Sequence, residues 1–229
     1  RKKEKINFCL VGEPTNPKKL GEMIKIGRRG SLSGNIQIFG TQGHIAYPHL
    51  SNNPINTLVA ICKKLKEKKL DKGNKNYQPS NLEFTSINVD NKAHNVIPAR
   101  ARAQFNVRYN NFHTANSLKK KITNLVKNIS GKNKCKFKID FMANGEAFLT
   151  KPERTIFMAR KIIKKITKIN PKFSTTGGTS DARFIRKIAP CLEFGLVNKT
   201  MHRVDECVSL TDLRKLTKIY NDILVEYFK

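Results

Sequence analysis

Hydrophobic and polar positions along the middle of the chain predict strands and helices in the order β-α-β-β-α-β. Strict alternation, typical of half-buried strands, runs through residues 31–39, 101–108 and 135–141. A further strand is expected over 82–89, with a slip in phase near Ser86, and apolar residues recur at helical spacing after Pro54 and after Thr114. The order is that of a ferredoxin-like unit, an antiparallel sheet with two helices on one face. We therefore expect residues 30–143 to form a domain of their own.

The flanking segments have the pattern of one α/β domain into which this unit is inserted. Short apolar strands are expected over 6–11 and 188–194, a helix from Pro152 to Ile169, and a final helix over 211–228. The expected fold class is α/β, with residues 1–29 and 144–229 as the first and second parts of the larger domain.

Charge adds a preference for anionic ligands. Lys and Arg number 45 against 17 Asp and Glu, a formal net charge of +28. Such an excess raises the question of nucleic-acid binding, because clustered basic side chains displace counterions from phosphates. Here 33 Lys and 12 Arg are spread along nearly every expected helix, which favours a solvated lysine surface. We expect no nucleic-acid partner, and a positive field that attracts a small anionic substrate.

Cysteine spacing and the absence of long apolar runs indicate the class of protein. The five cysteines are odd in number and widely spaced, with no C-x-x-C pair for a zinc or redox motif: Cys9, Cys62, Cys135, Cys191 and Cys207. No apolar run approaches the roughly 18 residues of a membrane span, and no signal-peptide pattern opens the chain. We expect reduced cysteines, a cytoplasmic location and no membrane partner.

Four segments hold polar groups that core packing does not require. They are residues 12–14, 43–49, 174–181 and 198–206. Taken singly, each is weak evidence, because a Glu after a strand is more often a turn residue and a lone His is more often structural. The Gly-rich segment 174–181 is either an anion cradle of free backbone amides at a helix start, or only a helix entry capped by Ser180 or Asp181.

Taken together, the motifs resemble the di-zinc aminoacylase/carboxypeptidase-like metallohydrolases, in particular those that remove a succinyl group from a diamino acid. The similarity covers nearly the whole chain and rests on residues 11–14 (VGEP), 27–32 (GRRGSL), 43–49 (GHIAYPH), 95–98 (NVIP), 175–181 (TTGGTSD) and 202–208 (HRVDECV). It implies that residues 30–143 are a dimerisation lid. It also implies a homodimer with two Zn²⁺ ions per subunit, Co²⁺ being a substitute.

The resemblance assigns roles motif by motif. Glu13 and His202 correspond to metal ligands, one for each zinc, and both are residue types that Zn²⁺ accepts. His44 corresponds to the catalytic histidine that reaches into the partner subunit's site and stabilises the oxyanion of the tetrahedral intermediate. The implied substrate-binding residues are Arg28, Tyr47, Asn95, Arg108, Gly178, Thr179 and Asn198.

The implied reaction is hydrolysis of N-succinyl-LL-2,6-diaminopimelate to succinate and LL-2,6-diaminopimelate, a step of lysine and diaminopimelate biosynthesis. The substrate carries three carboxylates, which guanidinium groups and loop amides can hold. The family's His-x-Asp motif and Glu-Glu pair, which supply the other ligands and the general base, lie upstream of the Gly-Glu-Pro motif. Only twelve residues precede Glu13. We therefore expect a C-terminal portion of such an enzyme, inactive alone. His94 stands where the family usually has an asparagine.

Two other functions stay open. The first is a related N-acyl amino acid amidohydrolase of the acetylornithine deacetylase type, since the metal machinery does not choose the acyl group. The motif at 27–32 and the loop at 175–181 favour the succinyl substrate. The second is a non-catalytic dimerisation module, which the missing ligands would explain.

Overall fold

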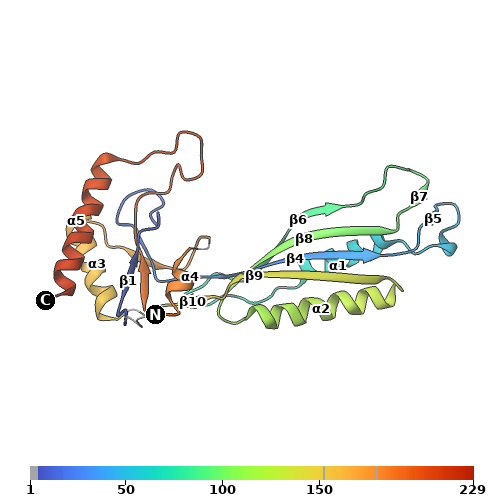
Figure 1. The fold of residues 1–229 in the computed structure, drawn as a ribbon, viewed down its shortest axis with the longest axis horizontal. Coiled ribbons are helices and arrows are strands. Elements are labelled where there is room, and N and C mark those ends of the chain that lie inside the picture. The colour runs from blue at the N-terminus through green and yellow to red at the C-terminus, as the bar shows by residue number, and fades with distance from the viewer. Residues whose placement is uncertain (1–4, 152, 179) are drawn as a thin grey trace. The chain divides into compact units, whose positions relative to one another are not determined.

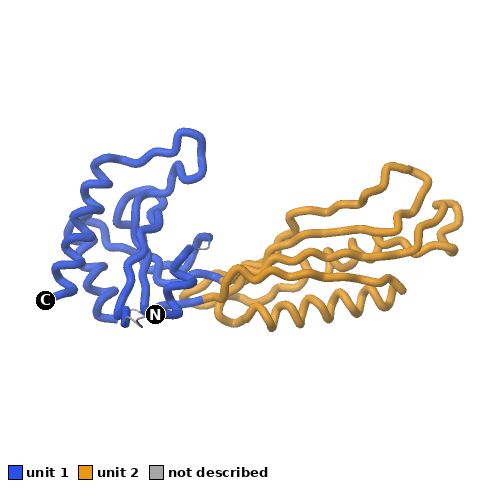
Figure 2. The backbone as a smooth tube through the Cα atoms, viewed as in Figure 1, with its two compact units in different colours: residues 1–29, 148–229 blue, residues 30–147 orange. Residues whose placement is uncertain are grey.

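The chain folds into two units, one inserted in the other (Figures 1 and 2). The computed structural model describes residues 5–151, 153–178 and 180–229. Unit 1 comprises Arg1–Arg29 and Phe148–Lys229, and unit 2 comprises Gly30–Ala147. The chain therefore leaves unit 1 once and returns to it, and the predicted α/β class with an inserted unit is confirmed.

Unit 2 is a four-stranded antiparallel sheet with two helices. Its elements are β4 (Gly30–Phe39), α1 (Pro54–Glu67), β6 (Asn81–Asn88), β8 (Arg100–Tyr109), α2 (Ala115–Lys132) and β9 (Lys136–Gly145). The strand order β6-β8-β4-β9 is the predicted ferredoxin-like order. Side chains from both helices, such as Leu58 and Leu118, share one core with alternate strand positions such as Ile36 and Phe105. Both helices therefore cover the same face of the sheet.

Details of unit 2 follow from its sequence. The pairing of β6 with β8 shifts in register between Phe84 and Ser86, where the phase slip was predicted. Thr114 caps α2: its hydroxyl accepts the amide N–H of Ser117 at 3.1 Å, and the Ser117 hydroxyl accepts the Thr114 N–H at 3.0 Å. Strand β9 continues to Gly145 because it pairs there with Ser31 beyond an irregularity. Unit 2 therefore ends at Ala147 rather than at 143.

Unit 1 contains a four-stranded sheet of three-residue strands in the order β1-β12-β2-β11. Its elements are β1 (Cys9–Val11), β2 (Met23–Lys25), β3 (Gly27–Arg28), β10 (Phe148–Leu149), α3 (Arg154–Thr167), β11 (Lys172–Ser174), α4 (Ala182–Ile185), β12 (Cys191–Glu193) and α5 (Leu210–Tyr227). The core between the sheet and the helices α3 and α5 includes Ile24, Ile163, Leu192 and Ile219. Cys191 contributes to a smaller cluster with α4.

Several predicted boundaries in unit 1 were too wide. Strand β1 begins at Cys9 rather than at Ile6, which is 48% exposed. Strand β12 begins at Cys191, because the amides of Ile188 and Ala189 both donate to the Ile185 carbonyl and close the turn after α4. Helix α3 ends at Thr167, where Lys168 adopts a left-handed conformation. The predicted helix start at Pro152 lies outside the described residues. None of the helices in the described part of the chain is long and apolar enough to cross a membrane.

A buried carboxylate closes the long connection between α1 and β6. Asp71 accepts hydrogen bonds from the amide of Gly73 at 2.7 Å, the amide of Ser80 at 3.2 Å and Nδ2 of Asn110 at 2.6 Å, and its Oδ2 lies 3.0 Å from Nε2 of His113. Burial alone would raise the pKa of Asp71. The hydrogen bonds from Ser80, Gly73 and Asn110 outweigh it and lower the pKa to about 2 from the ordinary 3.8.

Asp71 should make unit 2 sensitive to acid. Because its pKa is lower in the folded state, the ionised carboxylate stabilises the fold above its ordinary pKa, and this contribution is lost as the pH falls from about 4 to about 2. The loss amounts to about 2 kcal/mol. Urea denaturation at several pH values should show that Asp71→Asn removes this part of the acid dependence. Asp140→Asn, which changes an exposed carboxylate on β9, is the control. An acid dependence unchanged in Asp71→Asn would contradict the assignment.

Candidate functional site

Two of the predicted site residues in unit 1 lie at one edge of its sheet. Strand β1 runs parallel to β12 with Val11 opposite Glu193, and further along the Asn198 amide donates to the Asn16 carbonyl at 2.9 Å. Because the carboxyl ends of parallel strands meet at the same edge of a sheet, Glu13 and Asn198 share that edge.

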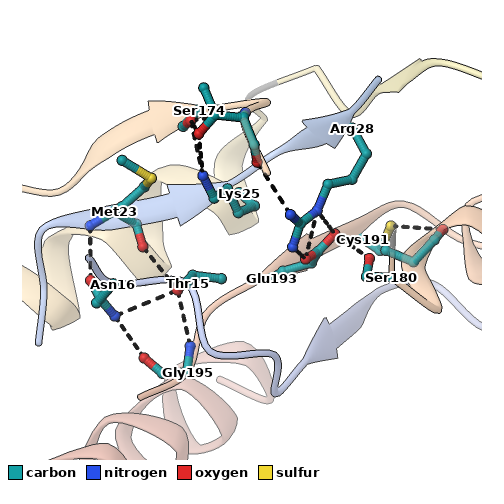
Figure 3. A network of polar contacts seen from close by, with 12 residues as sticks. Thr15, Asn16, Met23, Lys25, Arg28, Ser174, Ser180, Cys191, Glu193 and Gly195 are labelled. Atoms are coloured by element: carbon teal, nitrogen blue, oxygen red, sulfur yellow. Dashed lines mark hydrogen bonds and ion pairs between the residues drawn. The ribbon is translucent and has the colours of Figure 1, made fainter. Parts of the chain in front are cut away.

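A close backbone approach keeps these two segments together. A Cβ at Gly195 would overlap the carbonyl oxygen of Glu13 and lie 2.7 Å from that of Gly12, so only glycine fits. The Gly195 amide donates to Oγ1 of Thr15 at 3.2 Å, and Nδ2 of Asn16 donates to the Gly195 carbonyl at 2.6 Å (Figure 3). Both side chains are buried, so this edge is fixed by interior contacts.

His202 lies on the loop that continues from the same edge. The Thr200 hydroxyl donates to the Cys207 carbonyl at 2.8 Å and accepts the Cys207 amide at 3.1 Å, which closes the loop. His202 is exposed, has a φ of 61°, and its amide donates to the Glu206 carboxylate at 3.2 Å. Figure 1 shows the loop between β12 and α5 beyond the end to which β1 points.

The donor set of this chain does not by itself fit a zinc site. Among the described residues, no group of three or more His, Cys, Asp or Glu side chains is arranged to hold a metal ion. Glu13 is half-buried and His202 is exposed, and two such donors are fewer than a structural or catalytic zinc takes from protein.

A buried ion pair that the sequence did not reveal lies beside this edge. Glu193, 1% exposed, faces the guanidinium of Arg28, whose Nε lies 3.0 and 3.1 Å from the two carboxylate oxygens and whose Nη2 completes the ion pair. The Ser180 hydroxyl also donates to Glu193, at 2.7 Å (Figure 3). The carboxylate therefore has three donor groups, as a buried charge requires.

Arg28, one of the predicted substrate-binding residues, is engaged by protein groups. Arg28 is 7% exposed, and its remaining Nη1 donates to the Thr176 carbonyl at 3.2 Å. The structure thus directs Arg28 inward to Glu193 and to the 174–181 loop. The segment does enter a helix, as one of its two alternatives expected: Asp181 stands at the N-cap of the one-turn helix α4. Asp181 makes no side-chain cap hydrogen bond, however, and Ser180 binds Glu193.

A second buried cation contacts the same loop. Lys25, 5% exposed, donates from Nζ to Oγ1 of Thr176 at 2.6 Å and to Oγ of Ser174 at 3.2 Å. Burial and the charge of Arg28 lower the pKa of Lys25 to about 8 from 10.5, while the charge of Glu193 acts in the opposite direction. The sequence signal for both missed residues is a charged side chain inside an apolar run, Lys25 in MIKI and Glu193 in CLEF.

The two glycines of the loop meet different surroundings. Gly177 has a φ of 103°, and a Cβ there would overlap Nη1 of Arg28. Gly178 is exposed, and a Cβ there would meet no atom within 4 Å. The backbone at Gly178 therefore borders open space, as a substrate contact requires. Thr179, the neighbouring candidate, lies outside the described residues.

Three predicted site residues of unit 2 lie at or beside a short two-stranded sheet. Strand β5 (Gly43–His44) pairs with β7 (Val96–Ile97), and the 3₁₀ helix η1 (Pro48–Leu50) follows β5. The Ile45 amide donates to the Asn95 carbonyl at 3.0 Å, and the rings of His44 and Tyr47 lie 5.9 Å apart. Nδ1 of His44 accepts the amide N–H of Ala46 at 3.1 Å, which leaves the proton of a neutral ring on Nε2.

Arg108 lies at the other end of the same sheet. Phe39 pairs with Arg100 at the end of the sheet near β5 and β7, whereas Ser31 pairs with Arg108 at the far end. The eight-residue step along β8 corresponds to about 26 Å at about 3.3 Å per residue. Nη1 of Arg108 is buried without a hydrogen-bond partner in the described part of the chain. Within unit 2, His44 and Arg108 are therefore too far apart to bind the same small molecule.

Comparison with known proteins gives one family and several similar proteins. Residues 26–147, just over half of the chain, match the peptidase dimerisation domain. The whole chain is 64% identical over 228 residues to a succinyl-diaminopimelate desuccinylase of Pelagibacter ubique and covers 59% of it. It is 49% identical over 229 residues to a protein of the same name from Methylobacterium radiotolerans and covers 58% of it. The chain thus spans about three fifths of the length of these relatives.

Solved structures share the fold at low sequence identity. Aminopeptidase PepT from Bacillus cereus matches 97% of this chain with a TM-score of 0.82 and 15% identity, and 58% of that protein is covered. A tripeptidase from Staphylococcus aureus matches 96% of the chain with a TM-score of 0.78 and 15% identity, and 57% of it is covered. At this identity the similarity establishes the fold alone.

Replacing each of the two loop glycines with alanine should show that position 177 requires glycine and that position 178 does not. Gly177→Ala forces an L side chain into a left-handed conformation and against Arg28, which should cost about 1–3 kcal/mol in the free energy of unfolding. Gly178→Ala, with no neighbour near its Cβ, should change it by less than about 0.5 kcal/mol. Urea denaturation measures both. Equal losses in the two variants would show that Arg28 does not occupy the described position.

Proposed function

We propose, since the chain belongs to the family defined by the peptidase dimerisation domain, that it forms the larger part of an enzyme that hydrolyses N-succinyl-LL-2,6-diaminopimelate. The observation that carries the proposal is the similarity, over the whole chain, to relatives named for this activity. The two-unit fold supports it, because the inserted ferredoxin-like unit coincides with the matched dimerisation domain.

Glu13 and His202 are the proposed metal ligands of this chain. The parallel pairing of β1 with β12 supports the assignment, because Glu13 follows β1 and His202 lies on the segment that follows β12. The remaining donors would come from sequence that this chain does not contain. A bound Zn²⁺ would supply Lewis-acid polarisation of the amide carbonyl. By this proposal the 229-residue chain alone is inactive.

The 174–181 loop and Asn198 are proposed to hold carboxylates of the substrate. The loop lies against two buried cations, Arg28 and Lys25, and one buried anion, Glu193. The excess of positive charge favours an anionic group at the exposed backbone of Gly178. Arg28 acts in this proposal through the loop it supports.

His44 is proposed to donate a hydrogen bond to the oxyanion in the site of a second copy. Because Nδ1 accepts the Ala46 amide, Nε2 is the ring nitrogen left to act as such a donor. Its separation from Arg108 along the sheet supports a role in another subunit's site, because a small substrate cannot bridge about 26 Å. The proposed complete enzyme is therefore a homodimer through unit 2, with exchanged side chains.

The acyl group is tested by a direct comparison of substrates. The product of the complete reading frame, assayed with zinc present, should hydrolyse N-succinyl-LL-2,6-diaminopimelate with a kcat/KM at least about 100-fold above that for N-acetylornithine. The longer succinyl chain carries a carboxylate that the acetyl group lacks. A higher kcat/KM for N-acetylornithine would contradict the proposal and would support an amidohydrolase of the acetylornithine deacetylase type. No hydrolysis of either substrate would support a non-catalytic module.

Removal of the His44 side chain should lower kcat without dissociating the dimer. In the same full-length protein, His44→Ala should reduce kcat about 10²–10³-fold, the usual effect of losing one oxyanion donor. His49→Ala is the matched control, because it changes an exposed histidine in η1, the 3₁₀ helix that follows β5. This variant should keep kcat within about twofold. Light scattering should give the same dimer mass for both variants. A normal kcat in His44→Ala would refute the proposed role.

A further inference from the structure

Three polar side chains form a row across the ends of three strands in unit 1. Lys25 ends β2, and it lies in register with Glu193 at the end of β12 and with Ser174 at the end of β11. Directly paired residues in neighbouring strands point to the same face of a sheet. The row Glu193–Lys25–Ser174 therefore lies on one face, directly below the loop that follows Ser174.

The row and its neighbours converge on one residue of the loop. Nζ of Lys25 donates a hydrogen bond to the Thr176 hydroxyl at 2.6 Å, and Nη1 of Arg28 donates one to the Thr176 carbonyl at 3.2 Å. Its own amide donates to the Ser174 hydroxyl at 3.1 Å. Side chain, carbonyl and amide of Thr176 are thus all fixed, and the two residues that follow are Gly177, packed on Arg28, and the exposed Gly178.

The buried cluster of Arg28, Lys25 and Glu193 carries a net positive charge. Arg28 is neutralised by Glu193, whereas Lys25 donates to the neutral hydroxyls of Ser174 and Thr176. The charged groups that face Lys25 are Arg28 from β3 and Glu193 from β12, and β11 faces it with a hydroxyl. Burial at 5% exposure makes the ammonium costly there. An anion bound at the neighbouring loop would offset that cost.

We propose that Lys25 is a positioning residue that fixes Thr176 and thereby presents the backbone at Gly178 to a carboxylate of the substrate. This inference rests on the proposed function for the identity of the substrate. It assigns to Lys25 no contact with the reacting atoms. It adds to the Arg28–Glu193 pair a second cation, one that donates to hydroxyl groups, and Figure 3 shows its side chain directed at the start of the loop.

The first test follows the loop and needs no catalysis. In the 229-residue chain, Lys25→Met keeps the length of the side chain and removes its charge and hydrogen bonds. Hydrogen exchange of the Thr176 amide should become at least about tenfold faster, because the turn that holds it loses one of its anchors. Exchange in unit 2 should not change. The control is Lys172→Met, which removes an exposed lysine from the adjacent strand β11. Equal exchange in the wild type and Lys25→Met would overturn the proposal.

The second test reads substrate binding in the product of the complete reading frame. Lys25→Met should raise KM for the succinyl substrate about tenfold with kcat changed less than about threefold, the pattern of a lost binding contribution. The wild-type KM should rise as the pH passes about 8, where Lys25 loses its proton, and that rise should be absent in Lys25→Met. A loss confined to kcat, or a KM equal to that of Lys172→Met, would overturn the proposal.

Thr176→Val keeps the test informative if Lys25→Met does not fold. It retains the ammonium but removes its hydroxyl acceptor, and it should give the same faster exchange and the same rise in KM. Unchanged values in a folded Thr176→Val would contradict the proposed link. If the wild type hydrolyses no succinyl substrate, the proposed function fails, while the exchange measurement still decides whether Lys25 positions the loop.

Discussion

The buried ion pair between Arg28 and Glu193 is the interaction on which the candidate site of unit 1 depends. Two charges taken out of water are tolerated only when their hydrogen bonds are satisfied. Here Glu193 is 1% exposed and is bound by the guanidinium and by Ser180. The same guanidinium reaches the Thr176 carbonyl. One pair thus ties β3, β12 and the 174–181 loop together, and it requires glycine at position 177.

The two units make separate contributions to the proposed enzyme. Unit 1 brings Glu13 and Asn198 to one edge through the parallel pairing of β1 with β12, and it places a positively charged support under the Gly-rich loop. Unit 2 carries His44, Tyr47 and Asn95 at or beside the two-stranded sheet β5–β7. Neither unit, in its described residues, contains a metal-binding set. In the proposed function the remaining metal ligands would come from outside this chain, which spans about three fifths of its relatives' length.

The sequence predicted unit 2 better than unit 1. The ten-residue strands β4 and β8 are long enough for the alternation of apolar and polar residues to be recognised in the sequence, and Thr114 marks the start of α2. The three-residue strands of unit 1 are too short to show a period, so their limits were misplaced. The two-residue strands β5 and β7 were missed for the same reason.

Candidate residues were found through motifs, whereas their contacts were not. Resemblance to a family singled out Arg28 and Gly178, but it could not show that Arg28 turns inward. That contact joins residues 165 positions apart in the chain, and no local pattern encodes its partner. Lys25 and Glu193 were overlooked because a charged residue in a short apolar run is normally assigned to the exposed face of a strand.

A double-mutant cycle on Arg28 and Glu193 tests the central interaction most directly. The free energy of unfolding would be measured by urea denaturation for Arg28→Met, Glu193→Met and the double variant. Each single change should cost about 3–5 kcal/mol, because it leaves one buried charge without its partner. The double variant should lose at least about 2 kcal/mol less than the sum of the two. Additive losses would show that these two charges do not form a buried pair, and the description of the site would then be wrong.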